Sequence, residues 1–397
     1  MIFRRKTKEH TIHMQEKDIV RIFREKFSSS PRVFKAPGRI NIIGEHTDYN
    51  DGYVLPAAID KAMNFAVAAN GDEQKVRLWA ADLGQGYEFS LDSLAPAPGF
   101  WATYLMGVCD QLQKKGCKIS GFDMVFGGDI PLGAGLSSSA ALECGALTAL
   151  NAIFSLAMEK EDIARTGQMV EHTFAGVKCG IMDQFASVMG RENSVIRLDC
   201  RDLSHEYFPF ELGDNIVVLC NTNVKHSLAS SEYNTRRHEC EQGLEICKKL
   251  FGVSSLRDVT VGQLEAEKDK FPPVVYKRLH YVTGEVVRVE QACENMKKGD
   301  MEAVGRLMYA THDGLSEEYE VSCPELDFLV NITRDDENVL GSRMMGGGFG
   351  GCTINIVKGS YADTFIGKAA AAYKKQTGTD MTAYKTSVKE GCHEVKA

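Results

Sequence analysis

The stretch Pro131-Leu-Gly-Ala-Gly-Leu-Ser-Ser-Ser-Ala140 decides how this chain folds, because it joins small residues and hydroxyls to an apolar segment. That segment, 141–150, is rich in Ala and Leu and predicts a buried helix. Small residues let the backbone approach a ligand closely, and the free N–H groups and positive dipole end of a helix start favour phosphate. We therefore expect an anion-binding loop here; an ordinary turn with a serine cap is the alternative.

A second informative segment, 37–52, groups polar side chains beside a short apolar strand. Its ionisable members are Arg39, Glu45, His46 and Asp48. The strand-like residues 40–43 precede Gly44 and a polar turn, so the pattern places this group at a strand end beside a cleft. An ionised carboxylate accepts two or more hydrogen bonds, which suits the hydroxyls of a sugar. A solvated surface loop is the alternative.

Length, composition and charge describe an ordinary globular protein. The 397 residues exceed a typical single core, which predicts two domains. A net charge of -8 argues against nucleic acid or an anionic membrane surface as a principal partner. The twelve cysteines occur without a Cys-x-x-Cys pair, so a zinc site is not expected. With no long apolar run, we expect a protein of the reducing cytoplasm.

Along the chain, the periodic patterns predict strands first and helices afterwards. An amphipathic helix is expected at 14–27, and the following segments are expected as strands: 32–36, 54–59, 64–69 and 75–80. Helices are then expected at 101–115, 138–154 and 160–177. This order favours an α+β fold in which helices pack on mixed sheets, and it argues against a regular βαβ repeat.

The order restarts after Asp199, which predicts a second domain. We expect strands at 215–220 and 352–357, and helices at 228–250, 274–298 and 302–312. The expected division is an N-terminal domain at 1–205 and a C-terminal domain at 206–397, although no linker composition marks it. Residues 1–13 are basic and polar and are expected to form a loose tail, with Met14 as an alternative start.

Three motifs together resemble the GHMP kinase family. Residues 38–49, Gly-Arg-Ile-Asn-Ile-Ile-Gly-Glu-His-Thr-Asp-Tyr, resemble its galactokinase signature, 131–140 resemble its ATP-binding motif, and 346–351, Gly-Gly-Gly-Phe-Gly-Gly, resemble its last glycine-rich motif. The chain contains no Walker-type Gly-Lys-Ser or Gly-Lys-Thr. A dinucleotide-binding loop at 346–351 is excluded because a strand-like segment follows it; close backbone packing without a ligand is the alternative. The resemblance implies a two-domain α+β fold with the active-site cleft between the domains.

The resemblance also implies the catalytic and binding residues. Asp183 would be the base that takes the proton from the C1 hydroxyl of galactose, with Arg39 as its matching cation. By residue type alone, an aspartate that follows a helix, as Asp183 does, is usually a cap or turn former. Tyr233 is by pattern alone equally a core aromatic. The implied sugar contacts are Glu45, His46, Thr47, Asp48, Gly180 and Tyr233. The implied ATP contacts are Gly133, Ala134, Gly135, Leu136, Ser137, Ser138 and Ser139.

The implied cofactors are ATP as co-substrate and Mg²⁺. Because Mg²⁺ takes only one or two protein oxygens beside phosphates, Ser139 and Glu171 are the expected ligands; a solvated helix residue is the alternative for Glu171. The implied reaction makes α-D-galactose 1-phosphate in a cytoplasmic, monomeric enzyme. The alternatives are a kinase for N-acetylgalactosamine or L-arabinose, and a galactose- and ATP-binding sensor without turnover.

Overall fold

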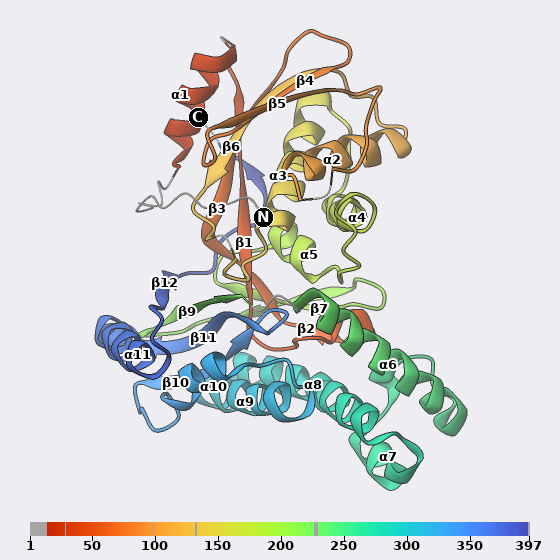
Figure 1. Ribbon diagram of the computed structural model, residues 1–397, viewed down its shortest axis with the longest axis vertical. Coiled ribbons are helices and arrows are strands. Elements are labelled where there is room, and N and C mark those ends of the chain that lie inside the picture. The colour runs from red at the N-terminus through yellow and green to blue at the C-terminus, as the bar shows by residue number, and fades with distance from the viewer. Residues whose placement is uncertain (1–13, 28, 98, 132, 226–228, 396–397) are drawn as a thin grey trace.

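The structure is a computed structural model that describes residues 14–27, 29–97, 99–131, 133–225 and 229–395. The expected tail at 1–13 lies outside these residues. Figure 1 shows two layered parts, one above the other, each built from a sheet and helices packed on it. Within the described ranges, no helix is both long and apolar enough to cross a membrane.

The upper part is built on a mixed six-stranded sheet. Its strands, in spatial order, are β13 (His393–Glu394), β1 (Arg32–Asn41), β3 (Pro56–Ala69), β6 (Phe122–Gly128), β4 (Lys75–Ala80) and β5 (Gln85–Ser90). All neighbouring pairs are antiparallel except β4 with β6. The two strands expected at 54–59 and 64–69 are wrong, because β3 runs unbroken through the polar pair Asp60 and Lys61. Asp60 keeps its place in the strand by accepting a 2.6 Å hydrogen bond from Thr386.

Helices cover both faces of this sheet. The helix α1 (Glu16–Phe27) lies on one face, and α2 (Ala102–Lys114), α3 (Ser138–Phe154), α4 (Lys160–Val170) and α5 (Met182–Met189) lie on the other (Figure 1). α3 starts and ends where the sequence predicts. The helix expected at 160–177 instead changes at Glu171 into a π-helical turn, Glu171–Ala175. Such turns often occur at functional sites.

The lower part has a four-stranded antiparallel sheet of β10 (Val339–Met345), β11 (Gly350–Lys358), β9 (Asn215–Lys225) and β12 (Thr382–Thr386). A three-stranded sheet joins β2 (Tyr53–Val54), β7 (Ser194–Asp199) and β8 (His205–Pro209). Figure 1 shows α8 (Pro273–Lys297), α9 (Met301–Asp313) and α10 (Pro324–Asn331) beneath the larger sheet. The remaining helices are α6 (Ala229–Phe251), α7 (Val261–Ala266) and α11 (Ala362–Thr377). The α+β class is confirmed.

The two parts share buried contacts. One apolar cluster joins Ile40 and Ile42 at the end of β1 to Val217 on β9, Met345 on β10 and Ile354 on β11. The chain also returns to the upper sheet at its end, where β13 pairs with β1. The division at 205/206 stays a prediction. This packing brings the end of β1 to the end of β10.

Candidate active site

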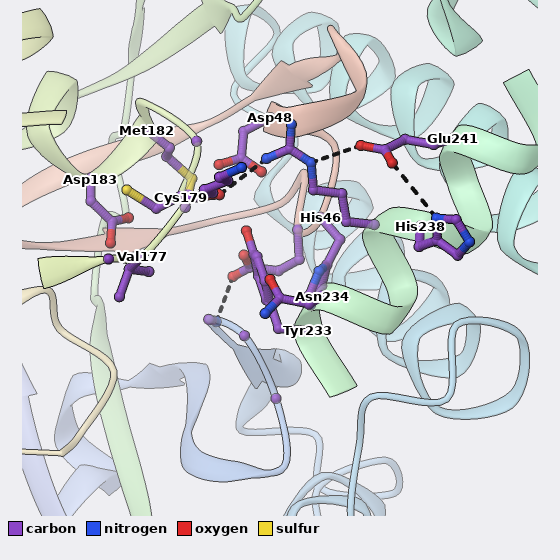
Figure 2. Close-up of a pocket in the computed structure, with 18 of the residues that line it drawn as sticks. His46, Asp48, Val177, Cys179, Met182, Asp183, Tyr233, Asn234, His238 and Glu241 are labelled. Carbon is purple, nitrogen blue, oxygen red and sulfur yellow. Dashed lines mark hydrogen bonds and ion pairs between the residues drawn. The ribbon is translucent and has the colours of Figure 1, made fainter. Parts of the chain in front are cut away.

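A cavity of about 740 Å³ opens where the end of β1, the segment 176–183, the start of α6 and the loop after β10 meet. Its lining includes most of the expected catalytic and sugar-binding residues: Arg39, Glu45, His46, Asp48, Gly180, Asp183 and Tyr233. Figure 2 shows His46, Asp48, Asp183 and Tyr233 gathered around this hollow, although they come from distant parts of the chain. Gly346, Gly347 and Gly348 complete one wall.

Asp183 is held from two directions. It lies in the first turn of α5. Arg39 donates from Nε to one carboxylate oxygen at 2.8 Å, and the Ser137 hydroxyl donates to the other at 2.5 Å. Arg39 is itself 4% exposed, and its Nη1 donates to the Gly135 carbonyl at 2.5 Å. The ion pair therefore connects the cavity directly to the stretch 133–139.

The stretch 133–139 has the backbone of an anion-binding loop. Gly133, Gly135 and Ser137 adopt left-handed φ angles of 73°, 72° and 60°. Ser137 precedes the first residue of α3 but makes no side-chain cap, because its hydroxyl is used by Asp183. The expected alternative of a serine-capped turn is therefore wrong. The first N–H groups of α3 stay uncapped by Ser137 and remain suited to phosphate.

Not every residue of this stretch can offer a side chain to a nucleotide. Ala134 and Leu136 are buried in the apolar cluster that joins the two parts, so only their backbone faces remain for a ligand. The Leu136 carbonyl accepts from the Arg39 backbone at 3.2 Å, which leaves fewer free groups there. Ser138 and Ser139 form the first turn of α3.

Two carboxylates lie beside the start of α3. Burial raises the pKa of the Glu171 carboxyl, and the neighbouring Ser139 hydroxyl partly offsets that shift. Glu143 was missed by sequence reasoning. It is fully buried, its one hydrogen bond to a described residue comes from Gln184 at 3.3 Å, and its Oε1 has no partner in the described part of the chain. A glutamate inside the apolar run 140–150 was the signal that could have revealed it.

The oxygen atoms of Ser139, Glu171 and Glu143 suit Mg²⁺, because carboxylates and hydroxyls are hard oxygen ligands. A bound cation would also stabilise the buried, unpaired carboxylate oxygen of Glu143. Burial and Glu171 together raise the pKa of Glu143 well above its usual value. Across the described residues, no group of three or more His, Cys, Asp and Glu side chains is placed to hold a metal alone. A cation here would need phosphate oxygens or water as further ligands.

Glu45 supports the cavity wall through one of its oxygens. Its Oε1 accepts from the backbone of Gly346 at 2.8 Å and from Arg343 at 3.0 Å. Arg343 is fully buried and also donates to the backbone carbonyls of Asn41 and Ile42 at 2.5 and 2.7 Å. Sequence reasoning missed Arg343. It fastens β10 to the end of β1, while Glu45 holds the glycine-rich loop that follows β10.

Asp48 and Gly180 face each other closely. A Cβ built on Gly180 would lie 1.8 Å from Asp48 Oδ2. Burial raises the pKa of Asp48 to about 7, with further contributions from Asp183 and Glu45. Thr47, expected to contact the sugar, lies outside the lining of this cavity: its hydroxyl is 2.9 Å from the Gly44 carbonyl and 2.7 Å from that of Tyr53. We assign Thr47 instead to support of the turn.

The comparisons with known proteins agree with this geometry. Residues 103–191 match the GHMP kinases N terminal domain, 292–375 match the GHMP kinases C terminal, and 21–69 match the galactokinase galactose-binding signature. The fold resembles the mevalonate kinase of Methanococcus jannaschii, with a TM-score of 0.63 over 91% of this chain and 99% of that one, at 18% identity. The chain belongs to the GHMP kinase family.

Closer relatives narrow the assignment. A galactokinase of Clostridium perfringens (strain 13 / Type A) is 42% identical over 94% of this chain and 98% of its own length, and one of Roseiflexus sp. (strain RS-1) is 39% identical over 94% and 95%. The crystal structure of Lactococcus lactis galactokinase complexed with galactose superposes with a TM-score of 0.91 over 95% of this chain and 98% of that one, at 34% identity. Within the family, this chain is one of the galactokinases.

Proposed function

We propose that this enzyme transfers the terminal phosphoryl group of ATP to the C1 hydroxyl of D-galactose, giving α-D-galactose 1-phosphate and ADP. The observation that carries the proposal is the contact of Asp183 with both Arg39 and Ser137, at 2.8 and 2.5 Å. This contact connects the cavity to the start of α3 through one carboxylate. Galactokinase relatives along nearly the whole chain support the same substrate.

The chain's own residues would perform the reaction by alignment and charge placement. Asp183 takes the proton from the attacking hydroxyl, and Arg39 fixes the carboxylate and offsets charge on the transferred group. Glu45, His46, Asp48, Gly180 and Tyr233 would bind the sugar, while 133–139 would bind the phosphates. Mg²⁺, held by Ser139 and Glu171, would neutralise phosphate charge when bound.

Coupled ADP-release assays with galactose, N-acetylgalactosamine, L-arabinose and glucose test the proposal. We expect turnover with galactose, and a loss of roughly 10²- to 10⁴-fold in kcat for Asp183→Asn, the range typical of a removed general base. Arg39→Ala should lose activity as strongly, with nucleotide binding retained in both variants. Near-parental turnover in Asp183→Asn would contradict the assigned base. Preference for another sugar, or binding without turnover, would favour one of the alternatives.

We also propose a monomeric enzyme of the cytoplasm without nucleic-acid or membrane partners. ATP as co-substrate favours that compartment, and all twelve cysteines are free, as expected where thiols stay reduced. Size-exclusion chromatography with light scattering tests the monomer, which would have the chain mass of 43.8 kDa.

A further inference from the structure

A chain of hydrogen-bonding side chains leads away from the cavity behind His46. Nδ1 of His46 is 2.7 Å from the hydroxyl of Tyr49, that hydroxyl is 2.9 Å from the hydroxyl of Tyr319, and the latter is 3.2 Å from the sulfur of Cys240. Of these four residues, His46 lines the cavity. The other three lie behind the cavity wall, and their hydrogen bonds lead to it through His46.

All four groups are neutral near pH 7. Burial lowers the pKa of His46 to about 4, so its ring carries one N–H and one lone pair. Burial also raises the pKa of Cys240 to about 12, and the pKa values of Tyr49 and Tyr319 lie well above their usual value for the same reason. Each of these groups can donate one hydrogen bond to the next, in one of two directions.

The acceptor at the end of the chain decides between the directions. Running towards His46, the thiol donates to Tyr319, Tyr319 to Tyr49, and Tyr49 to the imidazole lone pair on Nδ1, a good acceptor. Running away from His46, the last acceptor would be a thiol sulfur, which accepts hydrogen bonds weakly. The direction towards His46 leaves the proton of the ring on Nε2.

Nε2 is the nitrogen that remains for a ligand. The Gly347 carbonyl lies near the ring and partly offsets the effect of burial on the pKa of His46, but Nε2 makes no hydrogen bond within the described part of the chain. The ring is 4% exposed and lies 5.0 to 5.8 Å, centroid to centroid, from the rings of Tyr319, Tyr233 and Tyr49. A buried N–H without a partner is costly, so a sugar oxygen that accepts it is strongly favoured.

We propose that Tyr49, Tyr319 and Cys240 are positioning residues that fix His46 as the Nε2–H tautomer, so that it recognises the sugar as a hydrogen-bond donor. This inference rests on the proposed function for its substrate but not for the tautomer. The hydroxyl that meets His46 must then act as an acceptor, and an analogue lacking that oxygen should bind poorly because Nε2–H stays unpaired.

The tautomer can be read directly from the nitrogen shifts of ¹⁵N-histidine-labelled full chain without any substrate. Signals of His46 are assigned by their absence in His46→Gln. We expect an unprotonated Nδ1 in the parent chain, and a mixture of tautomers in Tyr49→Phe. A protonated Nδ1 in the parent chain, or an unchanged tautomer in both Tyr49→Phe and Tyr319→Phe, would overturn the inference.

Kinetics provide the second readout. Loss of one neutral hydrogen bond predicts a rise in the KM for galactose of roughly 3- to 10-fold in Tyr49→Phe, a smaller rise in Tyr319→Phe, and little change in kcat. Tyr373→Phe is the matched control, since Tyr373 is as fully buried as Tyr319 and its hydroxyl donates to the Thr222 carbonyl in another cluster. It should change neither readout. If galactose is not turned over but the tautomer is as expected, only the proposed function fails.

Discussion

Gly180 lies in the cavity wall with its α-carbon aimed at the carboxylate of Asp48, where a methyl group would come within 1.8 Å of Oδ2. Its φ is not in the left-handed region, so alanine is compatible with the backbone and the clash with Asp48 is the main cost. We expect Gly180→Ala to displace Asp48 and raise the KM for galactose roughly tenfold, in line with overpacking costs of about 1–3 kcal/mol.

A matched control for this change is Gly367→Ala on α11, where the added methyl meets open space. Alanine also suits a helix interior better than glycine, so this variant should keep the parental KM with equal or greater stability. A parental KM in Gly180→Ala as well would show that Asp48 does not contact the sugar.

Asp48 also makes stability depend on pH. Its pKa of about 7 in the folded chain exceeds the ordinary aspartate value, so between about pH 4 and 7 the folded state binds a proton that the unfolded state has lost. The contribution of Asp48 to the free energy of unfolding is therefore full below pH 4 and is lost as the pH rises through 7. Asp48→Asn should gain stability relative to the parent chain across this window. Urea unfolding of both chains at pH 5, 7 and 9 measures it, and a constant difference would contradict the raised pKa.

At the scale of elements, the serine at the start of α3 contacts α5 instead of capping its own helix. Ser137 occupies the capping position, but its hydroxyl bonds Asp183 on α5. Ser137→Ala should therefore change the free energy of unfolding by less than the ~1 kcal/mol typical of a lost serine cap. Its kcat should fall, because one of the two contacts that orient Asp183 is removed. Unfolding and steady-state assays on one preparation separate the two effects, and a large stability loss with normal kcat would assign Ser137 a capping role.

A comparison of the predicted and observed helices and strands shows which of them the sequence could predict. α3 and β4 were predicted to their terminal residues because apolar periodicity and polar or glycine boundaries agree at both ends. β3 was divided in two because Asp60 and Lys61 look like a turn when their partners are unknown. β5 was missed because it is short, contains Gly86 and is largely exposed, so it has little apolar alternation to detect. Polar residues inside a long buried strand account for the first error, and short length with exposure accounts for the second.

The residues of the candidate site also include some that the sequence could predict and some that it could not. Arg39, Glu45, His46, Asp48 and Asp183 stand in recognisable motifs, and the structure brings them to one cavity. Arg343 and Tyr319 carry no local signal of function, and the only local signal of Glu143 is its place in an apolar run. Their structural roles depend on contacts with residues far away in the sequence. Arg343, for example, donates to the carbonyl of Asn41, at a sequence separation of 302. A single sequence contains no information on such pairs until the chain is folded.

At the scale of the whole molecule, Arg343 holds the two parts together at the cavity. It lies on β10 of the lower part, yet it donates to the backbone of Asn41 and Ile42 in the upper part and pairs with Glu45, itself 2% exposed. Arg343→Met removes the cation and leaves a buried carboxylate unpaired. We expect a loss of about 3–5 kcal/mol in the free energy of unfolding, measured by urea denaturation.

The double variant Glu45→Gln with Arg343→Met separates charge from packing, because it removes the unpaired carboxylate as well. If the buried charge dominates the loss, the double variant should be more stable than Arg343→Met alone, even though it carries one more substitution. The Gly346 backbone N–H can still donate to the amide oxygen of the new glutamine, so the glycine-rich loop keeps its hydrogen bond to residue 45. Equal stability of the single and double variants would instead mean that the hydrogen bonds from Arg343 to the Asn41 and Ile42 carbonyls, and not its charge, join the two parts.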